Sequence, residues 1–279
     1  MAEPTVTVAA VQLCATEDVD RNLAECRRWV AEAASRGARL VALPECYAFL
    51  GRDEAQKRAI AEVLDEASPG PILAATREWA RDHRVWLIGG GMAERPAGDA
   101  AGDKVYNTLV VFAPDGRLAA AYRKIHLFDV DIPGGATLRE SDSTLAGDEV
   151  VTVATPLGVL GLSICYDLRF PELYRRLVDQ GAEILAIPSA FTAFTGAAHW
   201  HVLVRARAIE NQAFVVAPAQ VGRHNDRRES YGHSLIVDPW GGVLAECDGA
   251  HPGIAVAEID LDVLRTRRAQ MPCLEHRRF

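Results

Sequence analysis

The sequence of 279 residues predicts a single α/β domain. Short apolar runs, each as long as a buried strand, alternate with segments whose apolar residues recur at helical spacing. This alternation occurs in both halves of the chain, and no low-complexity linker separates them. We therefore expect stacked sheets and helices in one domain over residues 1–279, although the length alone would also allow two domains.

The pattern of the first half predicts strands and helices in the order β-α-β-α, followed by a further strand and a hairpin. Its helices have recognisable limits, because one stops at Gly37 and another opens at Pro71. The turn Pro114-Asp115-Gly116 marks the hairpin. The expected strands are 5–13, 40–43, 85–88, 107–112 and 117–122, and the expected helices begin near 20, 53 and 71, the second running over 53–66. We expect Gly89-Gly90-Gly91 to form a tight turn after its strand.

The second half follows a loop of about twenty residues from Lys124 to Ala146, which is long enough to predict a functional segment. Pro133, Gly134 and Gly135 mark this loop as irregular. Strands are then expected at 150–154, 159–165, 184–187, 213–217, 234–237, 243–246 and 254–259, with helices from 171, near 198–211 and at the end of the chain.

Three residues with reactive or charged side chains, Glu45, Lys124 and Cys165, each lie at the carboxyl end of a predicted strand. Open α/β sheets bind ligands at this edge. A free thiol is mostly protonated at neutral pH, so a cysteine nucleophile needs a base or a cation. A carboxylate could take the thiol proton and an ammonium could stabilise an oxyanion, which indicates acyl transfer from an amide or nitrile. The alternative is a buried structural cysteine with two solvated surface charges.

The composition narrows the function classes. A net charge of −8 and a pI of about 5.5 argue against a nucleic-acid partner. Six scattered cysteines without a C-x-x-C pair predict a reduced, metal-free interior. The first five residues lack the basic region of a signal peptide, so we expect a cytoplasmic protein. Residues 184–204 carry no charged side chain but contain Pro188 and two histidines, so we expect a strand, a loop and the start of a helix rather than a membrane span. His199 and His201 are two residues apart and make a poor metal pair.

Around these three residues the sequence resembles the nitrilase, or carbon–nitrogen hydrolase, superfamily over nearly its full length. The motifs are Leu43-Pro44-Glu45, the run from Tyr122 to Asp129, and the run from Cys165 to Leu173. The resemblance implies a four-layer α-β-β-α sandwich, with Cys165 as nucleophile, Glu45 as general base and then acid, and Lys124 as stabiliser of the tetrahedral intermediate. It implies no cofactor.

The resemblance extends to further residues of the site. Glu140 matches a second glutamate of related amidases and would orient Lys124 or the substrate nitrogen. The backbone N–H of Tyr166 would assist Lys124. Arg169, Phe191 and Thr195 would line the substrate pocket, where a guanidinium could pair with a carboxylate in bidentate fashion. Without the resemblance, Phe191 and Thr195 could equally be packing residues.

The segments 188–211 and 219–234 resemble the Nit branch of the superfamily, which contains amidases for deaminated glutathione and ω-amidases for α-ketoglutaramate and α-ketosuccinamate. The second segment is closer to the former. We expect a homodimer that hydrolyses the amide of deaminated glutathione to α-ketoglutarate and Cys-Gly through a thioester at Cys165. An ω-amidase is the nearest alternative. A catalytically idle binding protein of the same fold, and nitrile hydrolysis or acyl transfer to another amine, are weaker ones.

Overall fold

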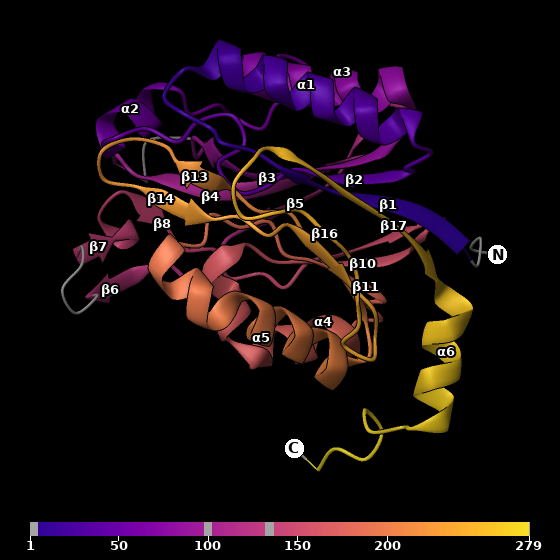
Figure 1. Cartoon of the computed structure of the whole chain (residues 1–279). Coiled ribbons are helices and arrows are strands. Elements are labelled where there is room, and N and C mark those ends of the chain that lie inside the picture. The colour runs from indigo at the N-terminus through magenta and orange to yellow at the C-terminus, as the bar shows by residue number, and fades with distance from the viewer. Residues whose placement is uncertain (1–4, 98–101, 132–136, 279) are drawn as a thin grey trace.

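The computed structural model describes residues 5–97, 102–131 and 137–278, and it shows four layers (Figure 1). Helices α1 (Val19–Ser35) and α3 (Pro71–His83) cover the outer face of one sheet. Helices α4 (Pro171–Asp179) and α5 (Ala193–Asn211) cover the outer face of the second sheet. The two sheets pack on each other between these helical layers, as the α-β-β-α expectation requires.

The first sheet has the strand order β17-β1-β2-β3-β4-β5, and β8 pairs with β4. Strands β1, β2 and β3 are parallel, so their carboxyl ends lie at one edge. The strands are β1 (Thr5–Gln12), β2 (Leu40–Ala42), β3 (Trp86–Glu94), β4 (Val105–Phe112), β5 (Leu118–Arg123), β8 (Thr144–Leu145) and β17 (Gly253–Asp260).

The second sheet has the order β16-β15-β12-β11-β10-β9, with β10, β11 and β12 parallel. Its strands are β9 (Thr152–Thr155), β10 (Gly158–Leu162), β11 (Ile184–Ala186), β12 (Phe214–Ala217), β15 (Leu235–Val237) and β16 (Val243–Glu246). Two separate hairpins are formed by β6 (Asp129–Asp131) with β7 (Thr137–Arg139) and by β13 (Val221–Arg223) with β14 (Glu229–Tyr231). The remaining helices are α2 (Glu54–Ala59) and α6 (Leu261–Gln270).

Two large clusters of buried apolar side chains hold the sandwich together. Leu109 of the first sheet and Leu162 of the second belong to one cluster of buried side chains. Val30 of α1 and Leu87 of β3 belong to another. Because the central parallel strands are covered on both faces, they consist almost entirely of apolar residues, which is why short apolar runs predicted them. The rigid parallel strands fix the positions of the loops at their carboxyl ends.

Several predicted elements differ from the structure. The helix expected over 53–66 ends at Ala59, because the backbone of Glu62 pairs with the edge of β3 and its carboxylate accepts hydrogen bonds from Ile72 and Leu73 at the start of α3. The glycines 89–91 form no tight turn but continue β3 through an irregularity in its pairing with β4. Helix α5 begins five residues before the expected start, where Thr192 caps it.

The long loop after β5 contains structure of its own. It holds β6, β7, β8 and a short 3₁₀ helix over Glu140–Asp142, while Pro133, Gly134 and Gly135 lie outside the described residues. The hairpin β13–β14 was not expected from the polar sequence between 223 and 229. Residues 184–204 form β11, a loop and part of α5, as predicted, and no helix among the described residues is long and apolar enough to cross a membrane.

Candidate active site

The loops that follow β2 and β5 bring Glu45 and Lys124 into direct contact. The ammonium of Lys124 lies 3.0 Å from Oε1 of Glu45 and 2.9 Å from Oε2 of Glu140. The Cys165 thiol adjoins this cluster, and the charges of Glu45 and Lys124 shift its pKa in opposite directions. The structure thus joins four residues that lie up to 120 positions apart in the sequence.

Glu45 is buried and all its carboxylate contacts are hydrogen-bond donors. Its Oε1 accepts from Lys124 and from the side-chain amide of Asn107, and its Oε2 accepts from the backbone N–H of Ala190 at 2.9 Å. The side chain of Gln220 donates to the Glu45 carbonyl at 3.0 Å, which anchors the backbone as well. These contacts fix the carboxylate in a single orientation.

Lys124 is held between the two carboxylates. Burial favours the neutral amine, but the charges of Glu140 and Glu45 outweigh it and keep the pKa of Lys124 well above its ordinary value. Burial also acts against ionisation of Glu140, yet Lys124, Lys57 and the N–H of Phe128 lower the pKa of Glu140 to about 2. Both groups therefore carry their charge at neutral pH.

The prediction that Cys165 ends a strand is wrong: β10 ends at Leu162, and Cys165, three residues later, starts a short 3₁₀ helix (Cys165–Arg169). Its φ of +46° lies in the left-handed region, and its N–H donates to the carbonyl of Pro188 at 2.9 Å. Burial and the charge of Glu45 raise the pKa of the thiol well above its usual range, against the opposing charge of Lys124. Cys165 is therefore a neutral thiol beside a carboxylate.

Asn107 is a site residue that the sequence interpretation missed. Its amide donates to Glu45 at 2.9 Å and to Glu140 at 3.3 Å, so it bridges the two carboxylates. Gly91 makes room for it, because a Cβ at that position would lie 2.5 Å from Oδ1 of Asn107 and 3.0 Å from Cγ of Glu45. A polar Asn-Thr pair interrupts the apolar run of β4, and this interruption was the available signal.

A second group of predicted residues lies around Arg169. Its guanidinium carbon is 5.1 Å from the ring centroid of Phe191 and 5.9 Å from that of Tyr166, within cation–π range. Thr195 in the first turn of α5 shares a hydrogen bond of 2.7 Å with Thr192. Arg169, Phe191 and Tyr166 thus lie together, and Thr195 lies four residues beyond Phe191.

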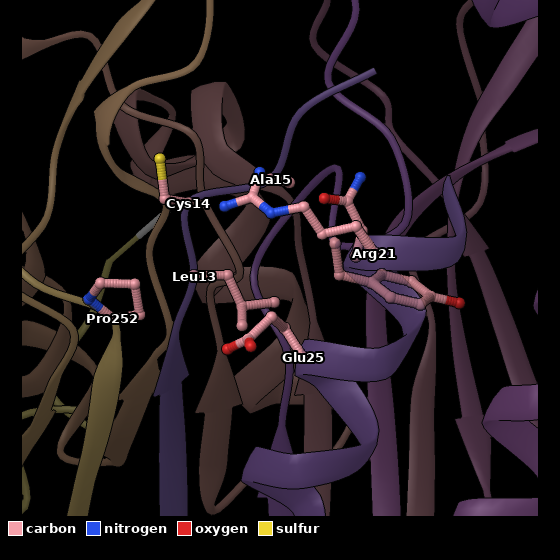
Figure 2. Close-up of a pocket in the computed structure, with 8 residues that line it drawn as sticks. Leu13, Cys14, Ala15, Arg21, Glu25 and Pro252 are labelled. Atoms are coloured by element: carbon pink, nitrogen blue, oxygen red, sulfur yellow. The ribbon is translucent and has the colours of Figure 1, made fainter. Parts of the chain in front are cut away.

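The cavity shown in Figure 2 is separate from these groups. Its lining comes from the segment that follows β1, from α1 and from the neighbouring loops, and includes Cys14, Arg21 and Glu25. Its volume of about 40 Å³ has room for a few water molecules and is far below the roughly 300 Å³ of a small ligand pocket. None of Glu45, Lys124, Glu140 and Cys165 lines it, so this cavity is no substrate pocket.

Comparison with known proteins places this geometry in a family. The carbon–nitrogen hydrolase family matches residues 7–269, and the chain belongs to that family. It is 47% identical over 272 residues to the deaminated glutathione amidase of Bos taurus. The match covers 97% of the chain and 81% of that protein.

Solved structures support the same assignment. The chain superposes on the C. elegans NitFhit protein with a TM-score of 0.91 and 43% identity, covering 100% of the chain and 66% of NitFhit. It superposes on Saccharomyces cerevisiae Nit3, a member of the nitrilase superfamily, with a TM-score of 0.88 and 33% identity over 100% of the chain and 98% of Nit3. The resemblance and the sandwich fold predicted from the sequence are thus confirmed.

Proposed function

We propose that the protein is a thiol amidase that hydrolyses deaminated glutathione to α-ketoglutarate and Cys-Gly. The observation that carries this proposal is the cluster of a carboxylate, an ammonium and a neutral thiol in the segments that follow β2, β5 and β10. The choice of substrate is supported by the 47% identity to a deaminated glutathione amidase over 97% of the chain.

In the first step, Glu45 takes the proton of the Cys165 thiol as the sulfur attacks the amide carbonyl carbon. Deprotonation has to accompany the attack, because the raised pKa of Cys165 leaves little thiolate at neutral pH. Donors from Lys124, Asn107 and Ala190 hold the Glu45 carboxylate in one orientation before the reaction. Glu140 in turn keeps Lys124 charged and fixed in place.

The attack creates an oxyanion on the tetrahedral intermediate, and the ammonium of Lys124 and the N–H of Tyr166 stabilise it. Tyr166 follows the nucleophile in the first turn of a 3₁₀ helix, where backbone N–H groups have no acceptor within the helix. The intermediate collapses to a thioester as the C–N bond breaks, and Glu45 returns its proton to the leaving amine of Cys-Gly. Water, deprotonated by Glu45, then attacks the thioester carbon. The C–S bond breaks, Glu45 returns the proton to the Cys165 sulfur, and α-ketoglutarate is released.

The substrate's α-keto carboxylate would bind Arg169. Its guanidinium can form two parallel hydrogen bonds with a carboxylate, and the rings of Phe191 and Tyr166 beside it would exclude water from the pair. Thr195 would supply a hydroxyl to the same pocket.

A substrate panel tests this proposal. Deaminated glutathione and α-ketoglutaramate are each incubated with the protein, and Cys-Gly and ammonia are measured separately. We expect the larger kcat/KM for deaminated glutathione, because binding of the Cys-Gly tail contributes to transition-state stabilisation. A larger kcat/KM for α-ketoglutaramate would instead make the protein an ω-amidase. Absence of turnover on both, with Cys165 alkylated no faster than the exposed Cys273, would indicate an idle binding protein.

We also propose a homodimer that buries the outer face of α5. Phe194 and Val202 on this face are 70% and 68% exposed, and Ile209 is 47% exposed, so one helix presents an apolar stripe to solvent. Light scattering should give twice the chain mass, whereas a stable monomer would contradict the proposal. A cytoplasmic location is supported by the six cysteines, all of which are free.

A further inference from the structure

Three side chains with metal-binding atoms meet on the surface, outside the active site. His201 comes from α5, His233 from the loop between β14 and β15, and Glu246 from the end of β16. Their ligand atoms all lie within 4.8 Å of one another, and theirs is the one such group within 5–97, 102–131 and 137–278. His199, two residues before His201, points elsewhere and contacts Arg169.

The carboxylate of Glu246 joins the two imidazoles. Its Oε1 lies 2.8 Å from Nε2 of His201 and 2.7 Å from Nδ1 of His233. The three side chains are between 26% and 33% exposed, so water and ions can reach them. Two imidazole nitrogens and a carboxylate oxygen are the donor set that zinc takes in many open sites.

The surrounding chain holds both imidazoles in place. His233 has a φ of +59°, and its carbonyl accepts a hydrogen bond from Nε1 of Trp200 at 2.8 Å. The ring of Tyr231 packs on both histidines, with centroids 4.5 Å from His233 and 5.8 Å from His201. Gly249 lies against the outer edge of His233, since a Cβ there would be 2.4 Å from Nε2. The left-handed backbone at His233 and the close packing of Tyr231 and Gly249 against its ring hold the imidazole in one orientation.

We propose that His201, His233 and Glu246 bind a divalent transition metal ion, with Zn²⁺ as the best-matched ion. At a Zn–N distance of about 2.0 Å, tetrahedral ligand atoms lie about 3.3 Å apart, so each Glu246–imidazole contact must open by roughly half an ångström. Each imidazole then carries its proton on its other nitrogen. The fourth position of the ion is left to water, because the protein supplies three ligands.

The test uses the full-length protein after dialysis against a chelator, titrated with zinc chloride by calorimetry and with Co²⁺ by visible absorption. We expect one ion per chain and a tetrahedral Co²⁺ spectrum. The variants H233N and E246Q should each weaken zinc binding by at least about 100-fold. Asn suits the left-handed backbone at 233, and Gln keeps the shape of Glu246, so both variants should fold, which circular dichroism checks. His199→Gln on the same helix is the matched control and should bind zinc as the parent does.

Two results would overturn the proposal. One is that the parent protein binds no zinc, which would leave the cluster as a hydrogen-bonded triad. The other is zinc binding that survives unchanged in H233N and E246Q, which would assign the ion to cysteine thiolates or other groups. Neither result bears on the amidase proposal, because no residue of this cluster belongs to the catalytic group.

Discussion

The hydroxyl of Tyr122 donates a hydrogen bond of 2.7 Å to the fully buried carboxylate of Asp167. The same carboxylate accepts hydrogen bonds from the backbone and ring nitrogens of His126 and from the N–H of Ile164. Tyr122 and His126 flank Lys124, and Ile164 precedes Cys165. Asp167 therefore ties the segment that carries the ammonium to the turn that carries the thiol.

Asp167→Asn should disrupt this connection. Replacing either oxygen with an NH₂ group places a donor against the N–H of Ile164 or of His126, at a cost of about 3 kcal/mol in unfolding free energy. Displacement of Cys165 relative to Lys124 by about 1 Å should lower kcat about 100-fold. Steady-state kinetics and thermal unfolding measure both effects.

Asp238→Asn is the matched control for this prediction. Asp238 also accepts two backbone hydrogen bonds, from Trp240 and Gly242, but in a turn between β15 and β16. We expect a modest loss of stability and an unchanged kcat. If both variants lost activity in proportion to their stability, Asp167 would have a structural role alone.

The sequence predicted the elements of the sandwich well because they depend on local patterns. Parallel strands covered on both faces must be apolar runs, and the residues after them lie at one edge of a sheet. The predicted strand ends pointed to Glu45, Lys124 and Cys165, although β5 before Lys124 is antiparallel to β4 and Cys165 lies in the turn after β10. The rules place residues at an edge, but they do not say which side chains touch.

The partners of these residues could not be predicted from local patterns. Asn107 reaches Glu45 only because β3 and β4 pair with an irregularity next to Gly91. Asp167 reaches Tyr122 only because the two sheets face each other. Both contacts depend on the order of strands and the packing of layers, which no pattern of apolar residues specifies.

Glu45→Gln should abolish turnover while preserving the fold. Glutamine keeps the shape of the side chain, but it cannot take a proton from the Cys165 thiol at neutral pH. We expect kcat/KM to fall by at least about 1,000-fold, within the range for loss of a general base. Cys165→Ala should be equally inactive, whereas Cys273→Ser, at an exposed thiol, should keep parental kinetics. Residual activity above about a tenth in Glu45→Gln would refute the assignment of the base.

Arg169→Lys should separate substrate binding from chemistry. Lysine keeps the positive charge but loses the planar pair of donors that matches a carboxylate. We expect KM for α-keto amides to rise about 10-fold to 100-fold with a smaller change in kcat, corresponding to about 1.4–2.8 kcal/mol. Arg265→Lys is the control, because Arg265 pairs with Asp262 on α6, away from the site. An unchanged KM in Arg169→Lys would remove Arg169 from the substrate pocket.

Glu140 should make the stability of the protein depend on acid pH. The pKa of Glu140 is about 2 in the folded protein and near its ordinary value of 4.5 after unfolding, so the unfolded chain binds the proton more readily. The stabilisation is therefore complete above pH 4.5 and is lost as the pH falls toward 2. Other carboxylates titrate in the same window, so the comparison needs Glu140→Gln, which cannot titrate. Between pH 6 and pH 3, urea unfolding of the parent should lose more free energy than unfolding of the variant. Equal losses would show that Lys124 does not hold Glu140 in its charged form.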